Sequence, residues 1–374
     1  MKILLAMSGG VDSSVAAALL QRDGHEVVGC FMRLGSPGEE LETPLAGDAC
    51  AVTPARIGHQ GCCSINDAAD ARLVAAKLGI PFYVVNFRND FGRIISYFED
   101  EYHAGRTPNP CVRCNDWLKF GKLRQYAEQL GCDAVATGHY AQRAETADGP
   151  RIMRGRDRAK DQSYVLFGIG PVAVQRMLLP IGAMEKPRVR ELARELDLPV
   201  SDKPDSQEIC FVPDDYASFL ARRAPTRFAA GAIEDESGRE LGRHDGHQHF
   251  TVGQRKGIRV PATIPLYVLR KDPTRNAVIV GPRESLDVGG VVAREVVWYP
   301  HRRTDAEVEC TAQVRAHGAP IPAQARLDGE GLEATLRIQF GRPEAGVAAG
   351  QAVVLYDRDE RILGGGWISD TFRA

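Results

Sequence analysis

Apolar and polar positions in the first part of the chain follow two periods. Short apolar runs predict strands over residues 2–7, 26–34, 80–87 and 133–139. Apolar residues at helical spacing predict helices over residues 11–22 and 66–78, and Gly79 follows the second helix where a helix commonly ends. A chain that alternates strand and helix in this way forms a mostly parallel, doubly wound α/β sheet.

The last third of the chain has the two-residue period of strands. Apolar residues alternate with polar ones at Val308, Cys310, Ala312, Val314 and Ala316. Leu332, Ala334, Leu336, Ile338 and Phe340 repeat the alternation, and residues 351–357 and 361–369 add two more strands. Together these strands predict a small antiparallel sandwich or barrel.

The change of period divides the chain into three predicted domains. These are an α/β domain over residues 1–211, a small central domain of short strands and turns over 212–282, and a β-barrel domain over 283–374. Between Gly35 and Gly61 the periodicity lapses, which predicts a long loop beside a site.

Composition places the chain among ordinary globular proteins. Of its 374 residues, 44% are hydrophobic and 26% charged. No apolar run approaches the roughly 18 residues that a membrane helix needs, and no secretory signal precedes the first strand. We therefore expect a cytoplasmic protein without a membrane partner. Its nine cysteines are then expected to be thiols, metal ligands or catalysts rather than disulfides.

The first candidate for chemistry is the stretch S-G-G-V-D-S-S at residues 8–14, between a predicted strand and a predicted helix. Gly9 and Gly10 allow a ligand to approach the backbone, and the N–H groups of a helix start bind phosphate. Asp12 is expected to bind Mg²⁺ or to order the loop. The stretch is not a Walker A loop, because no G-K-[ST] follows and no adjacent lysine reaches the phosphates. The alternative is a tight turn capped by serine.

S-G-G-V-D-S is similar to the pyrophosphate loop (PP-loop) of the ATP-pyrophosphatases. That resemblance implies cleavage of ATP between its α and β phosphates and adenylation of an oxygen. The group includes enzymes that install nitrogen and enzymes that install sulfur on tRNA. The loop by itself does not choose among them.

The sequence around three cysteines indicates which of these enzymes the chain resembles. Cys111 and Cys114 lie in TPNPCVRCNDWLKFG, and Cys210 lies in KPDSQEICFV. With GCCSINDAADARLVAAKLGIPFYVVNF, ATGHYA, KDQSYVL, EKPRVRELA and TVGQRKGI, these motifs make the chain resemble the bacterial tRNA-specific 2-thiouridylases almost from end to end.

The resemblance implies ATP-dependent replacement of O2 of the wobble uridine, position 34 of tRNA, by sulfur. In the family, Cys210 matches the cysteine that carries a persulfide, and Cys114 matches the cysteine that resolves it, leaving a disulfide to be reduced. The implied partners are tRNAs for Lys, Glu and Gln and a persulfide donor from a cysteine-desulfurase relay.

The resemblance also implies binding residues. For ATP, with Mg²⁺, they are Ala6, Met7, Ser8, Gly9, Gly10, Val11, Asp12, Ser13, Met32 and Gly138. For tRNA they are Asn109, Pro110 and Cys111 at the target base, and His139, Lys160, Asp161, Gln162, Arg315, Ala316 and Gln351 elsewhere. His139 also ends a predicted parallel strand, where ligands gather in open α/β sheets.

Cys111 is a departure from the family, because many members carry Asp at this position. The additional cysteine leaves a second mechanism open. Cys111, Cys114 and Cys210 are three thiolates, which can hold a [4Fe–4S] cluster and leave one iron free for sulfide. Two further rivals are another adenylating PP-loop enzyme and a non-catalytic, nucleotide-regulated RNA-binding protein.

Two basic segments are candidate contacts to tRNA phosphates, although the formal net charge of −2 shows no overall basic excess. RIMRGRDRAK, residues 151–160, has five basic residues against one acid, and GQRKGIR contains Arg255, Lys256 and Arg259. A solvated charged face is the alternative for the first segment. No metal site is expected at His244, His247 and His249, since no acidic or thiol partner is spaced to complete one.

Overall fold

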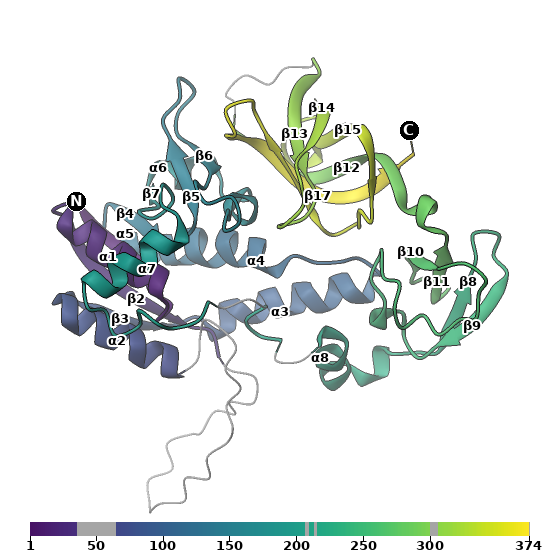
Figure 1. Cartoon of the computed structure of the whole chain (residues 1–374), viewed down its shortest axis with the longest axis horizontal. Helices are drawn as coiled ribbons and strands as arrows, with labels where there is room; N and C mark the ends of the chain where they lie inside the picture. The colour runs from purple at the N-terminus through teal and green to yellow at the C-terminus, as the bar shows by residue number, and fades with distance from the viewer. Residues whose placement is uncertain (36–64, 206–208, 213–214, 300–305, 374) are drawn as a thin grey trace, which may run out of the picture.

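The computed structural model of the protein describes residues 1–35, 65–205, 209–212, 215–299 and 306–373. In these residues a five-stranded sheet, a four-stranded sheet and a closed barrel follow one another along the chain (Figure 1). Most of the loop predicted between Gly35 and Gly61 lies outside the described residues, as do Cys50, Cys62 and Cys63.

The N-terminal sheet is parallel and doubly wound. Its strands are β1 (Lys2–Ala6), β2 (Glu26–Arg33), β3 (Phe82–Asn86), β4 (Ala134–Thr137) and β7 (Met177–Leu178). Their order is β3-β2-β1-β4-β7, and all neighbours are parallel. The winding reverses at β1, which has β2 on one side and β4 on the other, and such a switch point opens a crevice at the carboxyl ends of the strands. The predicted fold class is confirmed.

Helices bury both faces of this sheet. One apolar core includes α1 (Val11–Arg22), α2 (Ile65–Leu78) and α7 (Lys186–Glu195), and the other includes α3 (Arg88–His103) and α5 (Leu123–Gln129). Ile3 and Leu5 of β1 belong to the first core, and Leu4 belongs to the second. Because successive strand side chains point to opposite faces, a strand buried on both faces is a continuous apolar run.

A wide helical turn interrupts the segment between α3 and α5. It consists of α4 (Pro110–Arg113) followed directly by the π-helix η1 (Cys114–Lys122). A Cβ atom on Gly121 would lie 2.7 Å from the carbonyl oxygen of Asp116, five residues earlier. Glycine therefore permits the backbone approach between residues i and i+5 that defines a π-helix. This geometry was not predicted from the sequence.

Short elements link the α/β sheet to the rest of the chain. They are the hairpin β5 (Ala141–Ala144) and β6 (Arg151–Arg154), the 3₁₀ turn η2 (Ser163–Leu166) and α6 (Pro171–Gln175). The central sheet has the order β10-β11-β8-β9 and a small apolar core of its own. It comprises β8 (Gly231–Glu234), β9 (Glu240–His244), β10 (Tyr267–Asp272) and β11 (Ala277–Gly281), with α8 (Tyr216–Arg223), η3 (Pro225–Arg227) and η4 (His247–His249) alongside.

The C-terminal strands close into a barrel in the order β12-β15-β14-β13-β16-β17, which confirms the barrel prediction. After the turn η5 (Arg283–Leu286) they are β12 (Asp287–Trp298), β13 (Val308–Gln313), β14 (Ile321–Asp328), β15 (Thr335–Ala345), β16 (Ala352–Tyr356) and β17 (Ile362–Phe372). The alternation predicted for β15 is wrong at Leu332. This side chain is 97% exposed in the turn η6 (Gly331–Glu333), and β15 begins only at Thr335.

Across the described ranges, no helix combines the length and the apolar character needed to cross a membrane. The cytoplasmic location stays a prediction.

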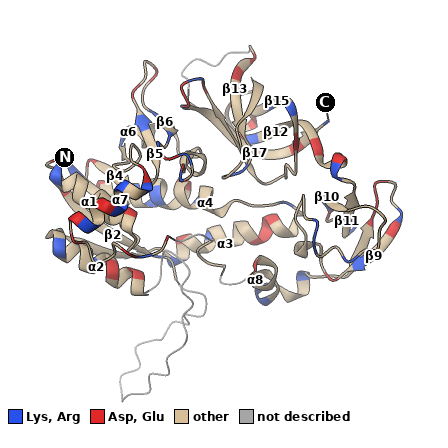
Figure 2. Ribbon diagram, viewed as in Figure 1, with Lys and Arg blue, Asp and Glu red and all other residues tan. Residues whose placement is uncertain are grey.

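Buried polar contacts seat the barrel on the N-terminal region. The Arg154 guanidinium donates to Gln313 of β13 at 2.7 Å, pairs with Asp161 at 2.9 Å and lies 3.7 Å from the Tyr356 ring centroid. Because Arg154 is buried, the expectation that it contacts tRNA phosphate is wrong. Arg156 and Arg158 of the same segment are exposed, and acidic and basic residues are interspersed over the ribbon (Figure 2).

A second contact joins the barrel to the helix that carries Cys114. Arg113 is buried beneath the rings of Trp367, Trp117 and Tyr97, at 4.0, 5.0 and 5.0 Å from their centroids. Its guanidinium donates to the Glu295 carboxylate of β12 at 2.8 Å. Glu295 has a φ of +48° within a strand irregularity. A non-glycine residue in this region is strained, so the bulge holds Glu295 in place at a conformational cost.

Replacing Glu295 tests this strain. Glu295→Ala and Glu295→Gly both remove the ion pair and leave a buried guanidinium without its carboxylate, so both should be less stable than the wild type. We expect Glu295→Gly to be more stable than Glu295→Ala by about 1 kcal/mol, because glycine adopts positive φ freely. Urea denaturation measures the difference. An alanine variant as stable as the glycine variant would show that no strain is stored there.

The end of α3 and the central domain together bury imidazoles and a lysine. His103, His244, His247 and Lys271 are all buried. No hydrogen-bond partner within the described part of the chain reaches His103 Nε2, His244 Nε2, His247 Nδ1 or Lys271 Nζ. Burial, with the Lys271 charge second, lowers the pKa of His247 to about 4, and burial lowers the pKa of Lys271 to about 8. Folding therefore disfavours the charged form of each group relative to the unfolded chain.

These pKa shifts predict a pH dependence of stability. His247 is neutral in both states above its unfolded pKa, and between about pH 6.5 and its folded pKa the unfolded chain takes up the proton first. The free energy of unfolding should therefore fall as pH falls through this window, and His247→Gln should reduce the fall. His249→Gln, an exposed histidine of the same turn, is the matched control. Equal losses of stability between pH 7 and pH 5 in the wild type and His247→Gln would contradict the assignment.

Candidate functional site

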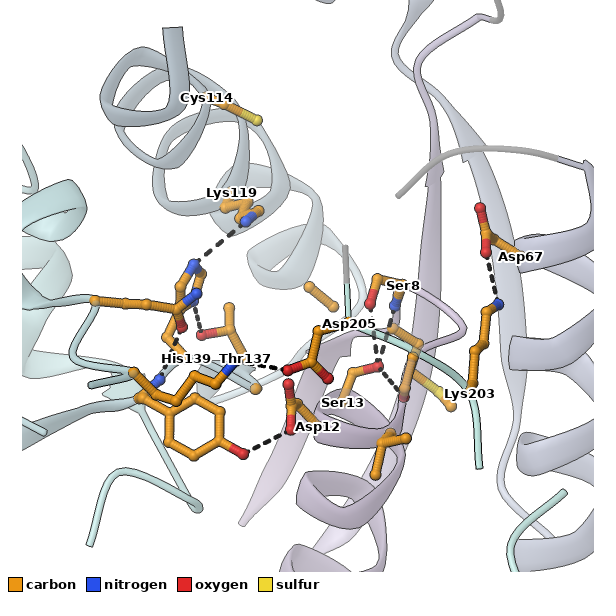
Figure 3. A pocket seen from close by; sticks show the side chains of 18 of the residues that line it. Ser8, Asp12, Ser13, Asp67, Cys114, Lys119, Thr137, His139, Lys203 and Asp205 are labelled. Atoms are coloured by element: carbon orange, nitrogen blue, oxygen red, sulfur yellow. Dashed lines mark hydrogen bonds and ion pairs between the residues drawn. The ribbon is translucent and has the colours of Figure 1, made fainter. Parts of the chain in front are cut away.

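A cavity of about 570 Å³ lies where the winding of the parallel sheet reverses. Its size is typical of a small-molecule site. Among the described residues, the lining comes from the loop after β1, the end of β2, Asp67 of α2, the π-helix, the end of β4 and the segments 159–162 and 203–205 (Figure 3), and His317 of the barrel region is added. Of the residues predicted for ATP, the following line it: Ala6, Met7, Ser8, Gly10, Val11, Asp12, Ser13, Met32 and Gly138.

The loop between β1 and α1 is shaped by two close backbone approaches. Gly9, with a φ of +71°, lies so near Asp67 that a Cβ would stand 2.2 Å from the Asp67 carbonyl oxygen. Gly138 would place a Cβ 2.7 Å from the backbone nitrogen of Ser13. The hydroxyls of Ser13 and Ser14 both donate to the Gly10 carbonyl, at 3.2 and 2.8 Å. The loop is therefore ordered around the start of α1, whose N–H groups favour an anion.

Two lysines that are distant in sequence reach this loop. Lys186 Nζ contacts the Asp12 carboxylate at 2.8 and 2.9 Å and Asp205 at 2.7 Å. Lys203 Nζ donates to the Gly9 carbonyl at 3.0 Å and to Asp67 at 2.6 Å. The sequence shows no lysine next to the loop, so these partners were missed. The motifs EKPRVRELA and KPDSQEIC, which contain them, were the available signal.

The Asp12 carboxylate has its bonds within the protein. Besides Lys186, it accepts from the Tyr140 hydroxyl at 2.7 Å. Of the two roles expected for Asp12, this geometry fits ordering of the loop and does not fit a Mg²⁺ ligand. Burial alone would raise the pKa of Asp205, but hydrogen bonds from Lys160 and Lys186 bring it down to about 2. The loop is thus held by ionised carboxylates against ammonium groups.

His139 is buried just after the end of β4, between Thr137 and Lys119 (Figure 3). Burial, and then the Lys119 charge, hold its pKa well below the usual range, so the imidazole is neutral. Lys119 Nζ lies 3.3 Å from His139 Nε2, and Thr137 Oγ1 lies 2.6 Å from Nδ1. An ammonium only donates, so Nε2 accepts from Lys119 and the ring proton resides on Nδ1, donated to Thr137.

The three cysteines are placed differently. Cys114 is half-buried at the first turn of the π-helix and lines the cavity. Cys111 is exposed on α4, and Cys210 is half-buried; neither is part of the cavity lining. Cys114 and Cys210 do pack against the same apolar core. Among the residues that the structure describes, no three His, Cys, Asp or Glu side chains gather to hold a metal ion, so these thiols do not fit a [4Fe–4S] cluster here.

The residues predicted to bind tRNA divide into two groups. His139, Lys160, Asp161 and Gln162 line the cavity. Asn109, Pro110, Cys111, Arg315, Ala316 and Gln351 do not.

The second group includes a contact between the barrel and the segment predicted to hold the base. Gln351 of the barrel donates to the carbonyls of Thr107 and Pro108, both at 3.2 Å. Asn109 then caps α4 by accepting from the Val112 N–H at 3.4 Å. In the first group, the Asp161 carboxylate accepts hydrogen bonds from Arg154 and from the hydroxyl of Ser163.

Three models of known protein families match consecutive parts of the chain. A tRNA methyl transferase HUP domain model matches residues 1–214, a tRNA methyl transferase PRC-barrel domain model matches 217–282, and an aminomethyltransferase beta-barrel domain model matches 288–368.

Curated relatives cover almost the whole chain. The tRNA-specific 2-thiouridylase MnmA of Rhodopirellula baltica is 46% identical over 98% of this chain and 96% of its own length. The proteins of the same name from Geobacter metallireducens and Zymomonas mobilis are 45% and 44% identical, over 98% and 99% of this chain and 96% and 94% of their own. The chain belongs to the tRNA-specific 2-thiouridylase family.

Proposed function

We propose that this protein is an ATP-dependent tRNA-uridine 2-sulfurtransferase that thiolates the wobble uridine, position 34. The observation that carries the proposal is a single cavity in which Cys114 faces the glycine loop at the start of α1. The loop is suited to a phosphate chain, and a thiol nearby is suited to sulfur chemistry. A non-catalytic RNA-binding protein needs no such pairing.

ATP is the proposed co-substrate. Its phosphates would lie against the N–H groups of residues 8–13, with Met32 and Gly138 beside the nucleoside. In the first step O2 of uracil attacks the α-phosphorus, the bond to the β-phosphate oxygen breaks with its electron pair leaving on pyrophosphate, and N3 of the base gives up its proton. The adenylated oxygen is then a leaving group.

Sulfur transfer completes the reaction. The terminal sulfur of a Cys210 persulfide attacks C2, and the C2–O2 bond breaks with its electron pair leaving on AMP. The Cys114 thiolate then attacks the Cys210 sulfur, which forms a Cys114–Cys210 disulfide and releases 2-thiouridine, whose N3 regains a proton. A thiol reductant restores both cysteines. The packing of both cysteines against one apolar core supports this pairing.

The substrates outside the protein are proposed on family grounds. They are tRNAs for Lys, Glu and Gln, with a cysteine-desulfurase relay as the persulfide donor. Asn109, Pro110 and Cys111 would receive the base, which must leave its stack in the anticodon loop to reach the cavity. The tether from Gln351 to residues 107 and 108 supports a receiving segment held by the barrel. Mg²⁺ would accompany ATP, bound mainly by its phosphates.

The decisive assay combines unmodified tRNA, ATP and a persulfide donor. Pyrophosphate release and retardation of thiolated tRNA in a mercury-containing gel are the readouts. We expect thiolation by the wild type, and a loss of at least about 10²-fold in Cys114→Ala and Cys210→Ala, because each removes a sulfur nucleophile. Cys111→Asp should stay within about tenfold of the wild type, because a persulfide relay exchanges sulfur only through Cys114 and Cys210. In a cluster enzyme the same substitution should weaken or re-tune the cluster, since iron–sulfur sites favour thiolates over carboxylates.

Two results would contradict this proposal. Equal loss in all three variants, with activity only in iron-loaded protein, would favour the cluster mechanism. ATP-dependent adenylation of another acceptor without thiolation would favour a different PP-loop enzyme.

The loop geometry predicts that Gly138→Ala weakens the binding of ATP and leaves the binding of tRNA nearly unchanged. Gly138→Ala places a methyl against the backbone of Asp12 and Ser13, at 2.8 and 2.7 Å, so the loop must shift. We expect ATP affinity to fall by at least about tenfold, because phosphate binding depends on the placement of backbone N–H groups, while tRNA affinity changes little. Gly92→Ala on α3 is the matched control, since its added Cβ meets nothing within 4 Å. Unchanged ATP affinity in Gly138→Ala, measured by calorimetry, would place the nucleotide elsewhere.

A further inference from the structure

The charges around the cavity do not balance evenly. Among the residues that the structure describes, three lysines line it: Lys119, Lys160 and Lys203. Lys160 pairs with Asp205 at 2.8 Å, and Lys203 pairs with Asp67 and Asp70, both at 2.6 Å. No carboxylate in the described part of the chain forms an ion pair with Lys119, whose contact is the neutral imidazole of His139 at 3.3 Å. Lys119 is therefore the lining lysine whose charge the described protein does not neutralise.

The π-helix gives Lys119 its position. Cys114 and Lys119 are five residues apart, the spacing of hydrogen-bonded residues in a π-helix, so they lie one above the other. Both line the cavity, and in Figure 3 the Lys119 side chain lies between Cys114 and His139. In an α-helix, side chains share a face at spacings of three and four, so residues five apart would diverge. The wide turn that Gly121 permits thus brings Lys119 and Cys114 to the same face of the helix, where both line the cavity.

His139 holds this ammonium without cancelling its charge. A carboxylate at the same place would form an ion pair and remove the positive potential, whereas a neutral Nε2 accepts one N–H and leaves the charge. Thr137 fixes the ring by its contact with Nδ1 at 2.6 Å. Two of the three N–H bonds of Lys119 remain for a ligand.

We propose that Lys119 is a catalytic residue that contacts the α-phosphate of the nucleotide during adenylation and during departure of AMP. The inference rests on the proposed function. In the proposed reaction, O2 of the target base is bonded to the α-phosphate. These bonded groups must lie in the cavity between the Cys114 sulfur and the glycine loop. The oxygens of the α-phosphate gain negative charge when AMP leaves. A preoriented donor in a partly buried site stabilises such charge most strongly in the transition state.

The test compares substitutions at Lys119 with a control on the same helix. Single-turnover thiolation by Lys119→Met should fall by about 10²- to 10³-fold, the usual effect of removing one oxyanion donor, with ATP and tRNA affinities within a few-fold. Lys119→Arg should recover part of the rate. Lys122→Met is the control, because Lys122 is half-exposed, pairs with Asp90 at 3.7 Å and does not line the cavity; it should stay within twofold.

Chemical rescue separates a charge from a structural role. Lys119→Ala should regain thiolation with added methylammonium or ethylammonium, in a saturable way, while its thermal stability stays unchanged by the amine. Thiolation by Lys119→Met within threefold of the wild type would overturn the inference. A loss that matches a fall in thermal stability and is rescued neither by arginine nor by amines would also overturn it. Failure of the wild type to thiolate tRNA would instead overturn the proposed function, and this inference with it.

Discussion

An ion pair and a hydrogen bond from the glycine loop to lysines 174 and 194 residues further along the chain are the constraint on which the candidate site depends. Lys186 joins Asp12 to Asp205, and Lys203 joins the Gly9 carbonyl to Asp67 and Asp70. A partly buried carboxylate is costly without a cation beside it. The aspartates of the loop, of α2 and of residue 205 therefore depend on these two lysines. The loop, helix α2 and residues 203–205 are therefore held as one unit.

The second constraint is steric. Gly9 and Gly138 stand where a Cβ would collide with backbone atoms of a neighbouring segment, and Gly121 stands where a Cβ would collide with the Asp116 carbonyl oxygen of its own helix. The first two let the loop pack against α2 and against the end of β4, and the third lets the π-helix form. Only then do Cys114, Lys119 and His139 meet the loop in one cavity. Three missing side chains thus determine how near the sulfur lies to the nucleotide site.

The barrel is part of the same arrangement. Arg154, Tyr164 and Tyr299 make buried polar contacts across the boundary between the N-terminal region and the barrel region. Arg113, one residue before Cys114, packs between rings from both regions and pairs with Glu295. His317 reaches the cavity itself. A helix that carries a reactive thiol is therefore braced by a domain whose sequence lies almost two hundred residues away, as the Arg113–Glu295 separation of 182 residues shows.

Periodicity and local motifs determined the α/β class, helix α1, the barrel strands and the glycine loop, because these depend on neighbours a few residues apart. Residues 352–356, all buried, form a strand where the sequence predicted one, over residues 351–357. Tertiary structure alone decided which charges meet: it buried Arg154, which looked like a phosphate contact, and brought Lys186 and Lys203 to a loop without a lysine of its own, with Lys119 in the same cavity. Charge is a local property of the sequence, but whether it faces a ligand, a carboxylate or a ring depends on segments that only folding brings together.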